Sequence, residues 1–175
     1  MEYLDRSELR RLFEVAYKCN KMHHLCFVVA FWNGSRISET LELTGKDVFD
    51  GKIRIKRKKG SLTTCHPIHI DIDPIFDASP VLQLAMRCGD NKLFPISRQR
   101  MDQLIKKYGL LAGIHESKLH MHSLKHSISM LLWHETKDLG QLQNFLGHKS
   151  QSSSLIYLRE IDATKAQQAV ANIRL

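Results

Sequence analysis

The sequence predicts a mainly α-helical fold with one small antiparallel β-sheet, the α+β class. Apolar residues recur at helical spacing through most of the chain, and two short alternating stretches on either side of Lys59 indicate a β-hairpin. A length of 175 residues with 43% hydrophobic residues suits one globular domain with a core of its own. We therefore expect residues 1–175 to form a single domain.

The N-terminal part predicts three helices. Asp5 and Glu8 have the spacing of a capping box, and apolar residues follow at helical spacing. Residues 25–32 are almost wholly apolar and stop at an Asn-Gly pair, which is typical of a core helix and its end. Ser35 can cap a short third helix that begins at Arg36.

The remaining elements follow from periodicity. Residues 52–56 and 65–70 alternate and predict two strands joined by a turn at Lys59-Gly60. Asp, Pro and Ser are frequent in residues 71–80, which we expect to be irregular. Helical spacing then returns in six segments: 81–88, 97–108, 123–134, 138–146, 150–158 and 163–173.

The charge of the chain predicts a polyanionic partner. There are 26 Lys and Arg against 18 Asp and Glu, a formal net charge of +8, which suits nucleic acid or an anionic membrane surface. No apolar run reaches the roughly 20 residues of a membrane span and no signal peptide opens the chain, so we expect a cytosolic protein. The four cysteines lack a CxxC pair, so we expect buried free thiols and no metal site.

Basic residues at four places are candidates for chemistry. Arg36 follows a glycine turn at a helix start, where its guanidinium and free N–H groups can face one anion. Lys59 lies at the hairpin tip, and His122 and Lys125 share one helical face if the helix has begun by His122. Taken singly, each has a plainer explanation: a solvated arginine, a solvated turn, and core or capping histidines.

The fourth place combines a histidine and a tyrosine. Gly147 can supply a left-handed helix end, His148 then leads into a new helix, and Tyr157 follows nine residues later. A tyrosine in an apolar helix is usually a core residue, so Tyr157 alone predicts no activity.

The order and spacing of these features resemble the catalytic domain of the tyrosine recombinase, or phage integrase, family. The resemblance covers nearly the whole chain. Residues 34–39 match its Gly turn and Arg-x-x-Glu helix, Lys59 precedes the strand that ends in Pro67-Ile68, and residues 122–126 match His-x-Leu-Arg-His. Leu-Gly-His with a tyrosine nine residues on completes the pattern. One position departs from it: Lys125 stands where the family has its second arginine.

The resemblance implies a recombinase that cuts DNA through a covalent 3′-phosphotyrosine and needs no cofactor, metal or ATP. Tyr157 would be the nucleophile and His122 would help accept its proton, while Lys59 would protonate the leaving 5′ hydroxyl. The phosphate would be held by Arg36, Lys125 and His148. Glu39 would orient Arg36 as a supporting residue. Because Lys125 keeps the charge but loses the planar two-pronged donor, we expect slower rather than abolished chemistry.

The same resemblance implies double-stranded DNA as partner, a tetramer on DNA, possible accessory DNA-bending proteins, and a cytoplasmic, nucleoid-associated place in a bacterial or phage setting. The helix at 163–173 would pack on its own domain or dock on a neighbouring protomer. Because the family usually carries an N-terminal DNA-clamping domain and this chain opens on what resembles the first catalytic-domain helix, we expect a fragment or a short recombinase. Candidates for DNA-backbone contacts are Lys56, Arg57, Lys58, Arg98, Arg100, Lys106 and Lys107.

Three alternatives stay open at this point. A type IB topoisomerase-like nicking and sealing enzyme would use similar residues. A DNA-binding protein with a weakened catalytic site would account for Lys125. An unrelated basic RNA-binding or membrane-binding domain would leave the register of the four features to chance.

Overall fold

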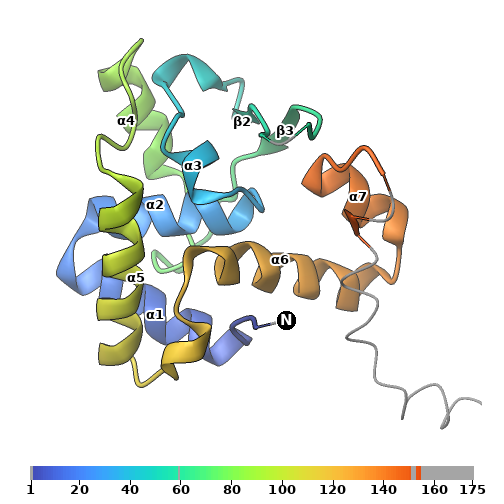
Figure 1. The fold of residues 1–175 in the computed structure, drawn as a ribbon. Coiled ribbons are helices and arrows are strands. Elements are labelled where there is room, and N and C mark those ends of the chain that lie inside the picture. The colour runs from blue at the N-terminus through green and yellow to red at the C-terminus, as the bar shows by residue number, and fades with distance from the viewer. Residues whose placement is uncertain (1, 59, 151–152, 155–175) are drawn as a thin grey trace, which may run out of the picture.

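Helices make up most of the fold, and a small sheet lies beside them (Figure 1). The computed structural model describes residues 2–58, 60–150 and 153–154. The predicted fold class is confirmed. The elements in chain order are α1 (Arg6–Cys19), α2 (Lys21–Trp32), α3 (Ile37–Thr40), the 3-10 helix η1 (Gly45–Asp47), β1 (Val48–Phe49), β2 (Lys52–Ile55), β3 (Thr64–Pro67), α4 (Pro80–Cys88), α5 (Arg98–Leu111), the 3-10 helix η2 (Glu116–Lys118), α6 (Met121–Thr136) and α7 (Leu139–Leu146).

The core is built around α2, which contacts α1, α3, α4 and α6. Every residue from His24 to Phe31 is buried, as expected of a helix that neighbours surround. The helix begins at Lys21, a turn earlier than expected, because the Asn20 side chain accepts hydrogen bonds from two N–H groups of the first turn. It ends at the predicted Asn33, immediately before the turn that carries Arg36.

The first helix packs an apolar stripe against this core. Asp5 accepts from the backbone N–H groups of Ser7 and Glu8, and the Glu8 carboxylate accepts from the Asp5 N–H at 2.9 Å. The predicted capping box is therefore confirmed. The Asp5 hydrogen bonds also hold the pKa of its carboxyl below the usual value.

The sheet is antiparallel, in the order β1-β2-β3. In the predicted hairpin, Lys52 pairs with Pro67 and Ile55 with Thr64. Both strands are shorter than the expected 52–56 and 65–70, and the second ends at a proline, which has no N–H to continue the ladder. The two-residue strand β1 was not predicted, since two residues carry no periodicity.

The C-terminal helices form a second apolar cluster. The Ser97 side chain caps α5 as predicted, accepting from the Arg100 N–H at 3.1 Å. Helix α6 begins at Met121, so it includes His122. Its Trp133 packs with Leu142 of α7. The predicted helices at 150–158 and 163–173 lie outside the described residues, apart from 150, 153 and 154.

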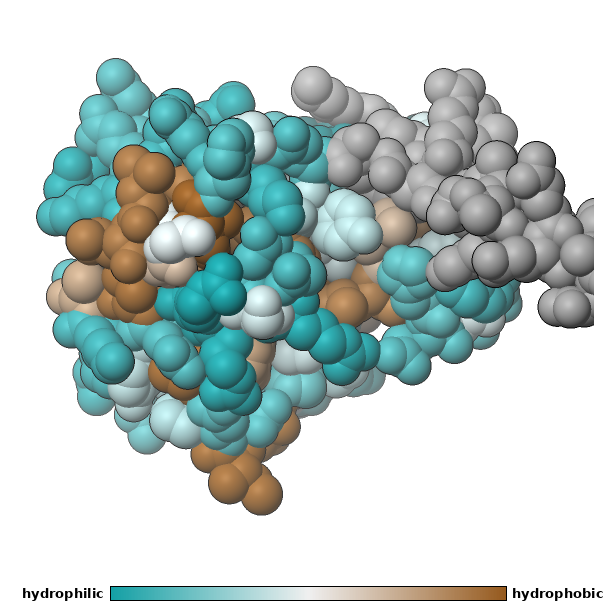
Figure 2. All heavy atoms as spheres, turned by 90° about the horizontal axis from the view of Figure 1, so that it is seen from below, coloured by the Kyte–Doolittle hydropathy of each residue, from teal (hydrophilic) through white to brown (hydrophobic). Residues whose placement is uncertain are grey.

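The surface of the described residues is mixed. On the face seen from below, hydrophobic side chains gather toward one end and hydrophilic ones cover much of the rest (Figure 2). All four cysteines are free, but the expectation that they are buried is wrong for two, because Cys19 and Cys65 are exposed. Among the residues with assigned structure, no helix has the length and apolar character needed to cross a membrane.

Candidate active site

The turn after α2 positions Arg36. Gly34 has φ of +51°, and Arg36 is the N-cap of α3. The Glu39 carboxylate accepts from the Arg36 backbone N–H at 2.9 Å and from its Nη1 at 2.7 Å. The expectation that Ser35 caps this helix is wrong: its hydroxyl lies 2.6 Å from Thr40 Oγ1 inside the core. Glu39 thus pairs with Arg36 one helical turn away, and its role as a supporting residue of the site stays a prediction.

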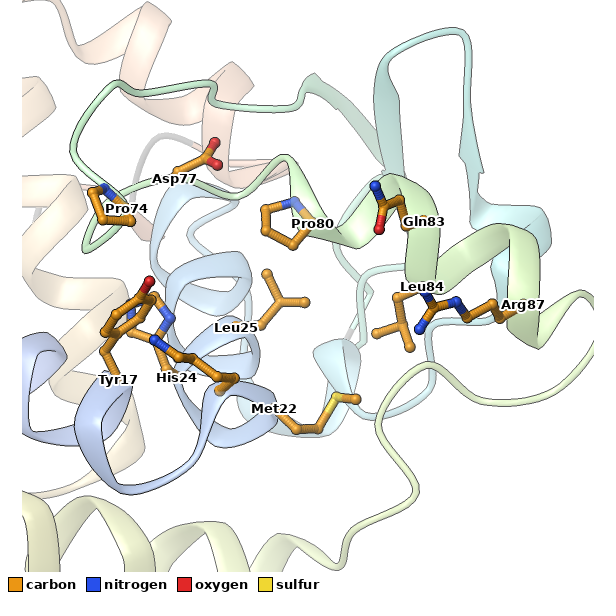
Figure 3. Close-up of a pocket in the computed structure, with 11 residues that line it drawn as sticks. Tyr17, Met22, His24, Leu25, Pro74, Asp77, Pro80, Gln83, Leu84 and Arg87 are labelled. Carbon is orange, nitrogen blue, oxygen red and sulfur yellow. The ribbon is translucent and has the colours of Figure 1, made fainter.

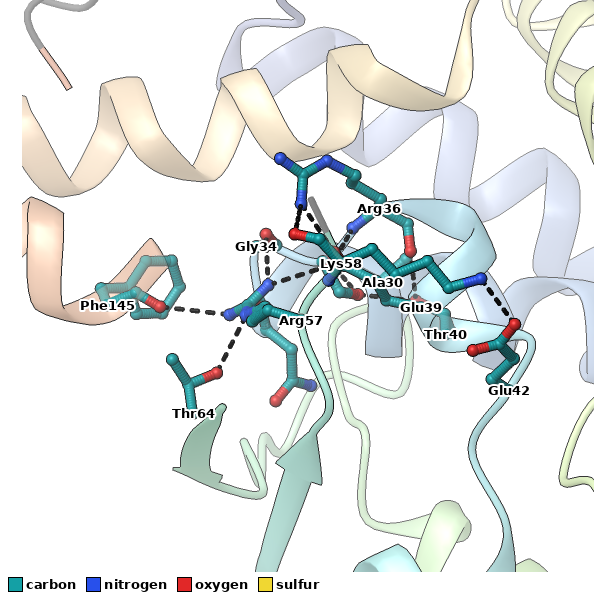
Figure 4. Close-up of polar contacts among 12 residues, drawn as sticks. Ala30, Gly34, Arg36, Glu39, Thr40, Glu42, Arg57, Lys58, Thr64 and Phe145 are labelled. Carbon is teal, nitrogen blue, oxygen red and sulfur yellow. Dashed lines mark hydrogen bonds and ion pairs between the residues drawn. The ribbon is translucent and has the colours of Figure 1, made fainter. Parts of the chain in front are cut away.

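The Glu39 carboxylate joins this turn to the hairpin. Its Oε1 also accepts from the Lys58 backbone N–H at 2.9 Å, and its Oε2 lies 3.5 Å from Arg57 Nη1 (Figure 4). Burial opposes ionisation of Glu39, but hydrogen bonds from the Lys58 and Arg36 N–H groups and from the Arg36 guanidinium outweigh burial and lower the pKa of the carboxyl. The side chain is fully buried and charged.

Of the basic residues on the hairpin, Lys56 and Lys58 have exposed side chains. The side chain of Lys56 is 71% exposed and its Nζ lies 3.3 Å from an Asp47 oxygen, while Lys58 pairs with Glu42 at the surface. Both side chains are at least partly exposed, and their contact with DNA stays a prediction. Lys59 lies outside the described residues.

The expectation that Arg57 contacts DNA is wrong, because its side chain is completely buried. The guanidinium donates to the carbonyl oxygens of Asn33 at 2.7 Å, Gly34 at 2.8 Å and Phe145 at 3.1 Å (Figure 4). Burial lowers the pKa of Arg57 to about 10, and the charge of Glu39 opposes the shift, so the group stays cationic at neutral pH. Its donors are engaged inside the protein.

Helix α6 carries the next two basic residues. Lys125 is buried, and burial, followed by the charges of Arg36 and Arg57, lowers its pKa to about 8. Burial, followed by the charges of His120 and Arg98, also lowers the pKa of His122. His122 is therefore neutral at neutral pH and can accept a proton.

His148 follows the end of α7. Gly147 has φ of +67°, as predicted, and the His148 N–H donates to the Gln143 carbonyl at 3.0 Å. Burial, followed by the charges of Lys125 and Arg36, lowers the pKa of His148 to about 4. The imidazole is neutral at pH 7.

Ser154 was not predicted as a site residue. Its side chain is buried and its Oγ lies 2.9 Å from His148 Nδ1. A hydroxyl that donates to Nδ1 leaves the ring proton on Nε2, which then becomes a hydrogen-bond donor. The signal in the sequence was weak, since Ser154 is one of several serines that follow His148.

These basic groups lie within electrostatic reach of one another. Arg36 lowers the pKa of Lys125 and of His148, and Lys125 lowers that of His148 and His122, although α3, α6 and the segment after α7 are distant in sequence. Glu39 offsets only part of this repulsion. Such a cluster favours an anion. Tyr157 lies outside the described residues, so its position relative to the cluster is a prediction.

A hollow of about 450 Å³ is lined by His122, next to the basic groups described above. Arg98 and Lys106, both expected to contact DNA, line it from α5. A separate hollow of about 260 Å³ lies beside α1, α2 and α4, lined by Tyr17, Leu25 and Pro80 among others, and no predicted site residue lines it (Figure 3). Within the described part of the chain, no three His, Cys, Asp or Glu residues form a metal-ligand group.

Comparison with known proteins identifies the family to which this fold belongs. Residues 2–163 match the model of the phage integrase family. The chain belongs to that family. Membership in the phage integrase family confirms the resemblance first noted in four short motifs, and it covers the segment that contains Tyr157.

Relatives within the phage integrase family are similar at modest identity. The type 1 fimbriae regulatory protein FimE of Escherichia coli K12 is 26% identical over 167 residues, covering 89% of this chain and 84% of that protein. The tyrosine recombinase XerA of Thermococcus onnurineus is 30% identical, covering 89% of this chain and 57% of its own length. The chain thus spans little more than half of that recombinase.

Solved structures of phage integrase type share the fold. The XerH site-specific recombinase bound to palindromic difH substrate, in a post-cleavage complex, has a TM-score of 0.75 and 23% identity, covering 98% of this chain and 53% of that one. A lambda integrase dimer bound to a COC′ core site has a TM-score of 0.72 and 17% identity, covering 92% and 61%.

Proposed function

We propose that the chain is the catalytic part of a site-specific DNA recombinase, which cleaves and rejoins DNA through a 3′-phosphotyrosine at Tyr157. The observation that carries the proposal is the cluster of Arg36, Lys125 and neutral His148, in which burial and the repulsion between the Arg36 and Lys125 charges leave Lys125 receptive to an anion. A DNA phosphodiester is such an anion, and its displacement adds charge to the nonbridging oxygens. Family membership and the fold shared with DNA-bound recombinases support the same activity.

The cluster would stabilise the phosphate. Glu39 holds the Arg36 side chain in place before DNA arrives, so little reorganisation is needed. Lys125 would contribute charge, and neutral His148, with its Nδ1 accepting from the Ser154 hydroxyl, would contribute an N–H donor through Nε2. Because these donors are preorganised and largely buried, each interacts more strongly with developing charge than it would in water.

Two proton transfers accompany the exchange of bonds. Tyrosine has an ordinary pKa near 10, so its proton leaves as the oxygen attacks phosphorus, and neutral His122 is the acceptor. The bond from phosphorus to the 5′ oxygen breaks, and Lys59 protonates that oxygen. The reverse steps reseal the strand. The phosphotyrosine bond conserves the energy of the phosphodiester.

Lys125 distinguishes the chain from its family pattern. An ammonium offers a point charge where a guanidinium would offer a planar pair of donors. Cleavage is therefore slower than an arginine would allow, and the site remains catalytic.

Double-stranded DNA is the proposed partner, and self-association on DNA accompanies recombination. A lambda integrase tetramer bound to a Holliday junction has a TM-score of 0.70 with this chain, which supports such an assembly. Residues 1–175 would act as one catalytic domain in which the 163–173 segment docks on a neighbouring protomer. The relatives reported above include recombinases and no topoisomerase, so nicking and sealing alone is not favoured.

Covalent trapping tests the proposal. The chain is incubated with a randomised library of nicked suicide duplexes, and DNA that stays attached under denaturing conditions is recovered and sequenced. We expect an adduct that Tyr157→Phe removes. Tyr17→Phe is the matched control, because Tyr17 lies beside the hollow away from the site and its loss should leave the adduct unchanged. Absence of any Tyr157-dependent adduct, even at low salt where DNA binding is tightest, would refute the activity.

A further inference from the structure

We infer that Arg57 is a positioning residue of this active site, whose guanidinium holds the Arg36 turn, the hairpin and the segment before His148 in one arrangement. The inference rests on the proposed function. It replaces the surface role that the basic hairpin sequence predicted for Arg57.

The contacts of Arg57 lead to three separate segments. Asn33 and Gly34, whose carbonyls accept at 2.7 and 2.8 Å, lie directly before the Arg36 turn. Phe145, whose carbonyl accepts at 3.1 Å, precedes His148 by three residues. Arg57 Nε also donates to Thr64 Oγ1 on β3 at 3.0 Å, which closes the base of the hairpin. One planar group thus links the segments that carry Arg36, Lys59 and His148.

Close packing leaves these segments little freedom around the guanidinium. A Cβ added to Gly34 would lie 2.7 Å from Phe145 Cε1, so the Arg36 turn and α7 are in direct contact. The Leu62 N–H donates to the Gly147 carbonyl at 2.7 Å, which joins the hairpin to the residue before His148. A Cβ added to Gly147 would collide with the Leu62 carbonyl. A displacement of one segment is therefore transmitted to the others.

Charge explains why an arginine is suited to this place. Glu39 Oε2 lies 3.5 Å from Arg57 Nη1, so the buried cation has a carboxylate partner as well as carbonyl acceptors. Lysine would keep the charge but has one nitrogen in place of three, held on a flexible stem. The single ammonium of a lysine cannot bond to all the acceptors that surround the planar guanidinium of Arg57 unless those acceptors move.

The first experiment compares rate with affinity in the longest available chain. Arg57→Lys should slow adduct formation on the trapped site by about 10–10²-fold, since small displacements of reacting groups cost about that much, and leave the Kd for DNA within about twofold. Arg54→Lys is the matched control on the same hairpin, because Arg54 contacts Asp47 away from the cluster. A rate within about twofold of wild type for Arg57→Lys would overturn the inference.

Salt dependence separates positioning from DNA contact. Arg57→Gln removes the charge, and a residue that neutralises a phosphate would lower the slope of log Kd against log salt by about 1. We expect an unchanged slope for Arg57→Gln and a lowered slope for Lys56→Gln. A lowered slope for Arg57→Gln would overturn the inference. If Arg57→Gln does not fold, Arg57→Lys still decides through the rate comparison.

A double-mutant cycle separates positioning from a general loss of stability. If Arg57 acts partly through His148, Arg57→Lys must cost less in a His148→Ala background than in wild type. Two rate deficits that simply multiply would show independent effects and contradict the inference.

Amide exchange gives a readout that does not depend on cleavage. Arg57→Lys should speed exchange of the Leu62 amide, which bonds to Gly147, and leave unchanged the Leu93 amide, which bonds to Leu43 elsewhere in the fold. If the Leu62 amide exchanges at the same rate in Arg57→Lys and in wild type, the inference is refuted, whether or not the wild-type chain forms an adduct. A wild type without adduct refutes only the proposed function.

Discussion

Arg57 and Lys125 are both buried cations near the proposed phosphate site, yet their surroundings differ. Carbonyl groups and the Glu39 carboxylate surround Arg57, whereas burial and the charges of Arg36 and Arg57 lower the pKa of Lys125 to about 8. A buried cation that the fold supplies with acceptors holds structure together. A buried cation that neighbouring cations destabilise is suited to an anion from outside.

Removing the charge is expected to affect the stability of the folded chain in opposite directions at Lys125 and at Arg57. In the absence of DNA, the charge of Lys125 is a cost to the folded chain, which a bound phosphate would offset. Removing the charge of Arg57 would instead leave Glu39 with one buried cation fewer.

The largest effect is expected for Lys125→Met. Loss of a donor to the transition-state phosphate should slow adduct formation by about 10²–10³-fold. The Tm should stay the same or rise, because a desolvated and repelled charge has been removed. Single-turnover cleavage and thermal melting measure the two effects, with Lys18→Met on the exposed end of α1 as control. A marked drop in Tm would contradict the difference drawn between the two cations.

A smaller effect is expected for Ser154→Ala. The variant removes the partner at 2.9 Å from His148 Nδ1 and frees the ring to adopt the other tautomer, which cannot donate from Nε2. Cleavage should slow by about 10-fold, the size typical of lost orienting hydrogen bonds, and Ser154→Thr should restore it. Ser153→Ala, on the exposed neighbour, is the control. Equal rates for the two alanine variants would show that the ring needs no such partner.

The smallest effect at neutral pH is expected for Lys125→Arg. A planar guanidinium should raise the cleavage rate at pH 7 by about 2–10-fold. Above about pH 8 the free wild-type chain loses the Lys125 proton, so its DNA binding should weaken, while Lys125→Arg should keep its affinity. Binding titrations from pH 7 to 9 test this, and parallel curves for the two proteins would refute the role given to the ammonium.

The lowered pKa of Lys125 also determines the direction in which the free energy of unfolding changes with pH. The folded pKa of Lys125 is lowered from 10.5 to about 8, so between these values the unfolded chain holds a proton that the folded chain has released. The free energy of unfolding should therefore rise with pH through this window, relative to Lys125→Met. Below pH 8 both states are protonated and the full cost of burying the charge is present.

Local signals made much of the fold predictable. The capping box of α1, the glycine turn before Arg36 and the left-handed Gly147 each depend on residues a few positions apart, and all three were predicted. The start of α2 was missed, although its cap at Asn20 is also local.

Long-range contacts explain the failures at the site. Arg57 stands in a basic run that resembles a solvated hairpin, but its acceptors at Asn33 and Phe145 lie 24 and 88 residues away in the sequence. The hydrophobic periodicity of the sequence does not reveal contacts between residues so far apart. Ser154 was missed for a different reason: it follows His148 closely, but nothing in the sequence shows that this serine, rather than one of its neighbours, lies against the His148 ring.

The hydrogen bond between the Leu62 N–H and the Gly147 carbonyl limits how the protein can be re-engineered. A hairpin grafted from a related recombinase would be a poor replacement, since its far arm also supports the loop that presents His148. Grafts that keep the spacing from Arg57 to Leu62 should be tolerated, and an insertion or deletion between them should displace the Gly147–His148 loop.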